Sequence, residues 1–197
     1  MKTQLTLYVI FIILITSCVQ KKQGDNMINK KLETIVNADT IGNKEIEMNL
    51  KNQLYLYSVA VHEGDPDVAI SYIYPDLLVY LKQQYPDDFS ITSMKESFRE
   101  MGRDMERTKE EMGLTYEYKI GKILNRIDLG SDKIYIIENY LIGKTDLEEY
   151  SERGVVVAIT NDNGQNWTFM EKDPESIPPT LRMKFSEDVV RQIMKIN

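Results

Sequence analysis

Apolar residues recur at helical spacing along the first half of the chain. The first such segment runs from Lys44 to His62, and Gly64, a residue type that commonly follows the last helical turn, ends it. Its apolar residues lie three or four positions apart: Ile46, Leu50, Leu54, Tyr57 and Val61. Asp65 and Pro66 suit the N-cap and the first position of a second helix, which must end before Pro75. These signals predict two helices joined by a short turn.

Two more helical segments follow. Residues 76–84 form the first, and residues 92–112 form the longest amphipathic segment of the chain, which ends at Gly113. The apolar stripe of this long segment is rich in methionine: Met94, Phe98, Met101, Met105 and Met112. A methionine stripe can form an adaptable binding groove. Beside a sheet the same spacing is more typical of core side chains, and we interpret the stripe as core.

After Gly113 the pattern changes to alternation, with Tyr116, Tyr118 and Ile120 separated by charged residues. β-branched and aromatic residues, with turn residues between the runs, predict four antiparallel strands. These strands cover residues 115–128, 133–142, 154–160 and 167–171, and the turns 129–132 and 161–164 have hairpin composition. Residues 174–179 are predicted to be a loop, and Ser186 the N-cap of a short last helix.

Helices followed by a strand meander predict an α+β fold, with N-terminal helices on one face of a curved antiparallel sheet of about four strands. This order, with the stretch from Gly64 to Leu78, resembles nuclear-transport-factor-two-like (ketosteroid-isomerase-like) domains over roughly residues 44–172. The resemblance implies a cystatin-like cone that encloses a pocket. Enzymatic members of that family use a carboxylate base and a tyrosine or acid donor there. Neither role can be matched to a residue of this chain, so neither is transferred to it.

The N-terminus has the pattern of an export signal. The eleven residues from Leu5 to Ile15 are apolar except for Thr6 and follow a positively charged Lys2. As a helix they span about 16 Å, roughly half of a bilayer core, which suits a signal peptide better than a membrane span. The sequence from Ile15 to Cys18 resembles the bacterial lipoprotein lipobox, with Ile in place of the usual Leu. The resemblance implies cleavage before Cys18 and acylation of this residue by palmitate-like chains; an ordinary secretory signal is the alternative.

We therefore divide the chain into a signal peptide (1–17), a lipidated Cys18 with a flexible tether (18–43) and one α+β domain (44–197). Residues 19–31 carry a net charge of +3, whereas residues 32–197 hold 19 basic and 30 acidic residues, a net charge of −11. A basic stem suits an anionic lipid surface, although solubility explains it equally well. The expected location is the cell envelope, with the outer membrane favoured over the inner one.

Composition excludes several classes of site. A single Cys and a single His exclude an internal disulfide, a cysteine-based zinc site and a multi-histidine metal site. The overall charge of −7 argues against a nucleic-acid partner. No P-loop, dinucleotide fingerprint or Ser-His-Asp order is present. The sequence predicts no cofactor, no metal and no identifiable catalytic residue.

Two short motifs remain. Asp39-Thr40-Ile41 fits the triplet at which Bacteroidota O-glycosylate exported proteins, which makes Thr40 a candidate acceptor, although chance explains a three-residue match as well. Residues 160–167 match the Asp-box pattern at all defined positions, which include Asp162, Gly164 and Trp167. In sialidase-like propellers this box repeats and is structural. Here it occurs once, and it predicts a hairpin between the last two strands.

Tyrosine is the most abundant candidate for ligand contacts. The chain has 12 tyrosines, and six lie on segments that would line a cone: Tyr72, Tyr74, Tyr116, Tyr118, Tyr135 and Tyr140. They suit an apolar ligand with one polar group, and core packing explains them equally well. His62 falls at the edge of a helix stripe, and we expect it at the surface or the pocket rim, with the helix dipole favouring its protonated form.

Three functions fit these features. The preferred hypothesis is a non-catalytic envelope lipoprotein that contacts the bilayer through acylated Cys18 and binds a small apolar ligand or a partner protein. This predicts a pocket without a buried carboxylate. A small isomerase-like or hydrolase-like enzyme would need an acid or His62 in the pocket with a shifted pKa. A structural subunit would need a filled cone and an exposed apolar patch.

Overall fold

The computed structural model describes residues 39–196, with side chains from residue 42 onward. The predicted signal peptide, Cys18, most of the tether and the Thr40 side chain lie outside this part, so lipidation and glycosylation stay predictions. Within residues 39–196, no helix combines the length and the apolar character needed to cross a membrane.

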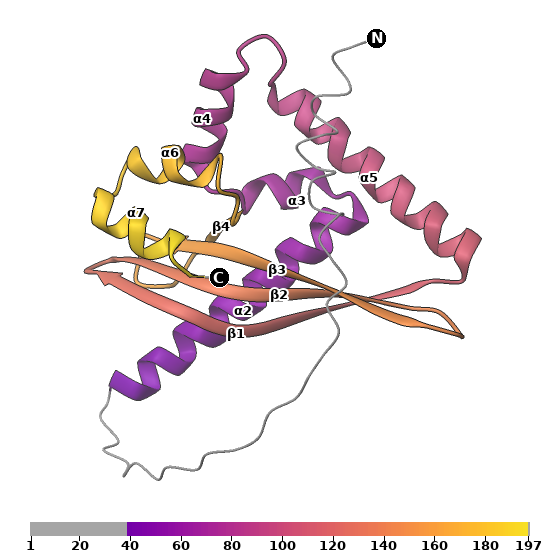
Figure 1. Cartoon of the computed structure of the whole chain (residues 1–197), viewed down its shortest axis with the longest axis horizontal. Helices are drawn as coiled ribbons and strands as arrows, with labels where there is room; N and C mark the ends of the chain where they lie inside the picture. The colour runs from indigo at the N-terminus through magenta and orange to yellow at the C-terminus, as the bar shows by residue number, and fades with distance from the viewer. Residues whose placement is uncertain (1–38, 197) are drawn as a thin grey trace. The chain divides into compact units, whose positions relative to one another are not determined.

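The described chain forms six helices and four strands (Figure 1). In order they are α2 (Asp39–Glu63), α3 (Pro66–Ser71), α4 (Pro75–Gln84), α5 (Ile91–Met112), β1 (Thr115–Leu129), β2 (Asp132–Lys144), β3 (Glu149–Thr160), β4 (Thr168–Glu171), α6 (Ile177–Arg182) and α7 (Glu187–Met194). The strands pair antiparallel in the order β1-β2-β3-β4. The predicted α+β class and four-strand sheet are confirmed.

Helix α2 packs on one face of the sheet, and α3 and α5 pack against α2. Leu50 and Leu54 of α2 are fully buried against alternate strand residues. These strand residues are Tyr135, Ile137, Val156, Ala158, Trp167 and Phe169. α3 and α5 join α2 through a second apolar cluster that contains Ala60, Ala69 and Phe98.

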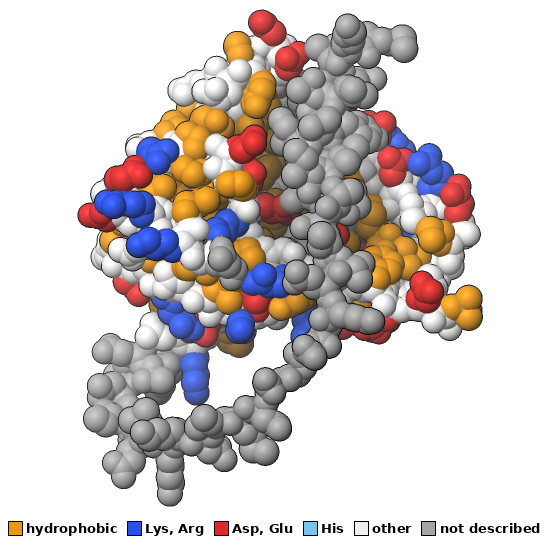
Figure 2. Space-filling view, in the orientation of Figure 1, with side chains coloured by type: hydrophobic (Ala, Val, Ile, Leu, Met, Phe, Trp, Pro, Cys, Tyr) orange, Lys and Arg blue, Asp and Glu red, His pale blue; other side chains and the backbone are white. Residues whose placement is uncertain are grey.

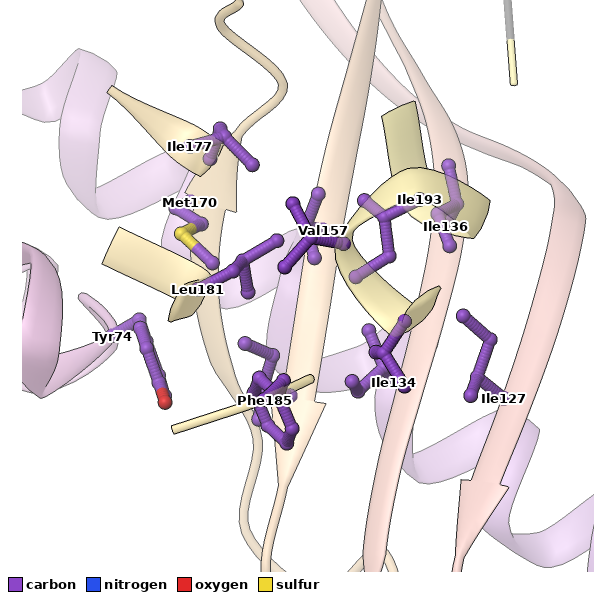
Figure 3. Close-up of a cluster of buried hydrophobic side chains, with 13 residues drawn as sticks. Tyr74, Ile127, Ile134, Ile136, Val157, Met170, Ile177, Leu181, Phe185 and Ile193 are labelled. Atoms are coloured by element: carbon purple, nitrogen blue, oxygen red, sulfur yellow. The ribbon is translucent and has the colours of Figure 1, made fainter. Parts of the chain in front are cut away.

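The C-terminal helices cover the other face of the sheet, to which the prediction had assigned no helix. Side chains of α6 and α7 pack on the strand residues that point away from α2 (Figure 3). Ile177, Leu181 and Ile193 are fully buried there against Ile134, Ile136 and Val157. The sheet is therefore apolar on both faces over this half, and each such side chain contributes about 1.5–3 kcal/mol of burial free energy.

Helix α6 lies where a loop was predicted. The two prolines at 178 and 179 suggested a turn, but proline fits the first turn of a helix, where its missing N–H is not needed. Ile177, Thr180 and Leu181 are buried. Packing of these side chains selects the helix over a loop.

A contact between two glycines brings the end of α2 against α5. Gly64 follows α2 with φ of +70°, and a Cβ on Gly102 of α5 would lie 2.7 Å from the Gly64 Cα. Only a glycine allows this backbone approach. The contact holds the last turn of α2 beside α5 and close to the start of β1.

Candidate functional site

The sheet face that points toward α2 changes character along its length. Residues paired across neighbouring strands form rows on this face. The rows under α2 are apolar, and one of them consists of Tyr135, Ala158 and Phe169. The registers place three further rows on the same face: Ile120, Asn139 and Gly154; Tyr118, Leu141 and Glu152; and Tyr116, Gly143 and Tyr150. The far end of this face therefore presents aromatic and polar groups.

A pocket of about 270 Å³ lies at this far end, between α2, α5 and the start of β1. Tyr55, His62 and Glu63 of α2 line it, together with Tyr116 and Tyr118 of β1. Val59, Met105, Lys109 and Glu117 complete the wall. The pocket combines an apolar lining with several polar groups, the usual character of a small-molecule site.

His62 lies in the wall of this pocket in a defined tautomer. Its Nδ1 lies 2.9 Å from the Ser58 carbonyl oxygen. A carbonyl can only accept a hydrogen bond, so we assign the proton to Nδ1, and Nε2 of the neutral ring carries a lone pair. The ring contacts that of Tyr118, with 4.6 Å between the ring centroids.

The expected protonation of His62 was wrong. Burial lowers its pKa, and the positive charge of Lys109 lowers it further, while the hydrogen bond to Ser58 acts in the opposite direction. Desolvation of the ring thus outweighs any preference for the charged form at the helix C-terminus. At neutral pH His62 is an uncharged hydrogen-bonding group.

The tyrosines at the sheet end form a connected cluster. Burial raises the pKa of Tyr118, and Tyr116, Glu63 and Tyr150 add to this effect through their proximity. The hydroxyl of Tyr150 hydrogen-bonds to that of Tyr116 across Gly143. A Cβ on Gly143 would collide with the Tyr150 ring, so glycine is needed for this link.

Some charged side chains around the pocket form salt bridges with other described residues, and one does not. The Glu117 carboxylate lies 2.8 Å from the Lys144 ammonium, and the Lys109 ammonium lies 3.0 Å from the Glu106 carboxylate. Glu63 forms no salt bridge with any residue of the described part. Within this part, one carboxylate at the pocket is therefore left without a cationic partner.

The structure separates the six tyrosines that we selected from the sequence. Tyr116 and Tyr118 line the pocket, and the other four do not. Tyr135 packs on Trp167 beneath α2, whereas Tyr74 lies on the opposite sheet face and donates its hydroxyl hydrogen bond to Asp76 at 2.8 Å. Tyr72 packs on Phe169 in the core under α2. Tyr140, next to Asn139 on β2, points away from α2.

Tyr55 was missed because it lies outside the core stripe of α2 and is 47% exposed. The sequence does contain a pattern that could have identified Tyr55. Positions 55, 59, 62 and 63 are separated by steps of four, three and one, so they lie on one face of the helix, next to the core stripe.

A second set of polar side chains lies on the same sheet face. Burial raises the pKa of Glu171 to about 7, and the nearby Glu152 adds to this. The Glu171 side chain is nevertheless exposed to solvent. The buried Oδ1 of Asn139 accepts no hydrogen bond within the described residues. These groups do not line the pocket.

The Asp-box residues form a hairpin between β3 and β4. The Asp162 carboxylate accepts hydrogen bonds from the backbone N–H groups of Asn166 and Gln165, both at 3.0 Å. The Asn166 N–H, the Thr160 hydroxyl, the Asn166 amide and the Gln165 N–H together lower its pKa to about 2. Gly164 has φ of +89°, and its carbonyl accepts from the Trp167 indole at 3.1 Å. The polar groups of the hairpin are thus used within the turn, which indicates a structural role.

Two features bear on other kinds of site. On the face drawn in Figure 2, hydrophobic side chains gather over α4 and again beside α5, with charged side chains around them. Val79 and Tyr85, on and directly after α4, are among the exposed ones. Among the described residues, no group of three His, Cys, Asp or Glu side chains is placed to hold a metal ion.

Comparison with known proteins identifies no relative: no family model matches the chain, and no curated protein matches it.

Proposed function

We propose that the domain binds a small ligand, with an apolar body and one polar group, in the pocket between α2, α5 and β1. The observation that carries the proposal is the set of groups around this pocket: three tyrosines and a neutral histidine beside Val59 and Met105. The volume of about 270 Å³ lies just below the usual range of roughly 300–1,000 Å³ for ligand pockets. A ligand the size of a single ring or a short branched chain suits it.

A blocked pocket tests this proposal. Val59 is half-buried in the pocket wall, so Val59→Trp fills the space, whereas Val79→Trp on α4 adds the same side chain at an exposed position. Ligand-detected NMR with a library of small compounds should find binders to the wild type and to Val79→Trp that Val59→Trp does not bind. Absence of binders, or equal binding to Val59→Trp, contradicts the proposal.

A second candidate is a small enzyme that uses the same pocket. The neutral His62, with a lone pair on Nε2 and a lowered pKa, favours it, because a general base must be unprotonated at the working pH. His62→Gln keeps a side chain able to donate to Ser58 and removes the base. If the pocket is catalytic, the wild type consumes a bound compound and His62→Gln only binds it. If the pocket only binds, both proteins leave the compound unchanged.

For the location, the proposal is a lipoprotein anchored in the cell envelope through acylated Cys18, with the residues between Cys18 and the start of α2 at Asp39 as the tether. The support is the lipobox resemblance and the single cysteine directly after it. Cys18→Ser should abolish labelling by an alkyne palmitate analogue and move the protein from the membrane fraction to the soluble fraction. Ser17→Ala keeps a small residue before the cleavage site and should behave as wild type. Unchanged fractionation of Cys18→Ser excludes the anchor.

A further inference from the structure

The aromatic content of the pocket suggests which polar group a ligand carries. Tyr55, Tyr116 and Tyr118 line the pocket together with the thioether of Met105. Aromatic rings carry negative charge on their faces and attract cations, and several rings around one pocket are typical of sites for substituted ammonium groups. Such a group also has the apolar methyl surface that Val59 and Met105 can contact.

The charges of the wall point to the same class of ligand. Glu117 and Lys109 are each paired with a residue of opposite charge, and Glu63 has no salt bridge within the described residues. An anionic ligand would lie beside this unpaired carboxylate, whereas a cation would neutralise it.

The end of α2 adds to this negative potential. His62 and Glu63 belong to the last turn of this 25-residue helix, and the carbonyl groups at a helix C-terminus carry partial negative charge. Residues 32–197 contain more acidic than basic side chains, and this net negative charge attracts cations at longer range.

Lys109 is the one cationic side chain in the wall. Its ammonium lies 3.0 Å from the Glu106 carboxylate, and its side chain is 37% exposed, which places the charge at the rim. His62 adds no second positive charge, because its burial keeps the ring neutral. Lys109 therefore does not cancel the attraction that Glu63 and the tyrosine rings exert on a cationic ligand.

We propose that the pocket recognises a small organic cation, a substituted ammonium group held between Tyr55, Tyr116, Tyr118 and Glu63. This rests on the proposed ligand-binding function and specifies the chemistry of its ligand. The tyrosine rings supply the cation–π attraction, and Glu63 supplies the counter-charge.

Isothermal titration of the purified full chain with three compounds of equal shape tests the charge preference. The probes are choline, its neutral isostere 3,3-dimethylbutan-1-ol, and the anion 3,3-dimethylbutanoate. Choline should bind at least about tenfold more tightly than either analogue, as expected for a cation–π and carboxylate site. Glu63→Gln should weaken choline binding at least about threefold and leave the neutral isostere unaffected. Glu45→Gln, near the other end of α2, removes the same charge away from the pocket and should change neither.

The outcomes distinguish the preference for a cation from the more general proposal that the pocket binds a small ligand. If the neutral or anionic compound binds as tightly as choline and Val59→Trp abolishes that binding, the pocket binds ligands but the preference for a cation is wrong. If choline does not bind at all, the inference is also overturned, while the compound library still tests ligand binding. If Glu63→Gln and Glu45→Gln weaken choline equally, the effect is general acidity and the assigned site is wrong.

Discussion

Replacement of Asp162 by alanine tests how strongly the hairpin holds β3 and β4 together. The carboxylate accepts two backbone N–H bonds at 3.0 Å, a 2.7 Å hydrogen bond from the Thr160 hydroxyl and a 2.7 Å bond from the Asn166 amide. Alanine leaves all four donors without this acceptor. Water can reach the partly exposed turn and will satisfy some of them.

The size of the effect follows from the pKa of Asp162. A decrease from 3.8 to about 2 corresponds to roughly 2.4 kcal/mol at about 1.36 kcal/mol per pH unit. Because the turn is partly exposed, solvent screening reduces this, and we expect Asp162→Ala to lower the free energy of unfolding by about 2 kcal/mol at pH 7. The pKa is lowered in the folded state, so this stabilisation is complete above pH 3.8 and declines as the pH falls toward 2.

Urea denaturation followed by circular dichroism at pH 7 and pH 3 measures both effects. The difference between wild type and Asp162→Ala should shrink to about half at pH 3, because the carboxylate of the unfolded chain, with its ordinary pKa of 3.8, is then largely protonated while the native carboxylate is still largely ionised. Asp162→Asn keeps one acceptor oxygen without the charge and should fall between the two proteins at pH 7. A loss below about 0.5 kcal/mol, or an equal loss at both pH values, would refute the reasoning.

Three other predictions concern the turn, Glu171 and the second sheet face. Gly164→Val should lower the melting temperature by the equivalent of at least about 2 kcal/mol, because φ is +89° and a Cβ would lie 2.8 Å from Ile46. Gly130→Ala, at φ +77° with open space around it, should lower the stability less. Equal losses of stability in the two variants would contradict the contribution of the clash with Ile46. Glu171→Gln should raise stability by on the order of 1 kcal/mol at pH 8, a value reduced for solvent contact, and by nothing near pH 4. The native pKa of about 7 lies above the ordinary 4.5, so stability falls as the pH rises between them, and a pH-independent gain in urea titrations would disprove this. Ile193→Ala should cost about 2–5 kcal/mol in the same assay, and a loss under 1 kcal/mol would argue against α7 packing on the sheet.

The candidate site was only partly predictable. Tyr116 and Tyr118 were selected because strand alternation places them on one face, and this is a local property of β1. Tyr55, Glu63 and Lys109 were not selected, and Met105 was interpreted as a core residue although it lines the pocket. They lie on two other helices, and only the packing of α2 against α5 brings them to β1. Tyr74 and Tyr135 show the converse error, since residue type alone does not separate a pocket wall from a core.

The sequence by itself determined the elements whose signals lie within a few residues. The helices and strands predicted from periodicity and alternation, and the turn that contains Asp162 and Gly164, depend on backbone geometry and short-range hydrogen bonds. These elements form as predicted. Tertiary structure alone decided the helical state of α6, the placement of α6 and α7 on the second sheet face, and the protonation of His62. Each depends on burial among residues distant in the chain. Burial selects a helix where prolines suggested a loop, and it outweighs the helix dipole that favoured a charged histidine.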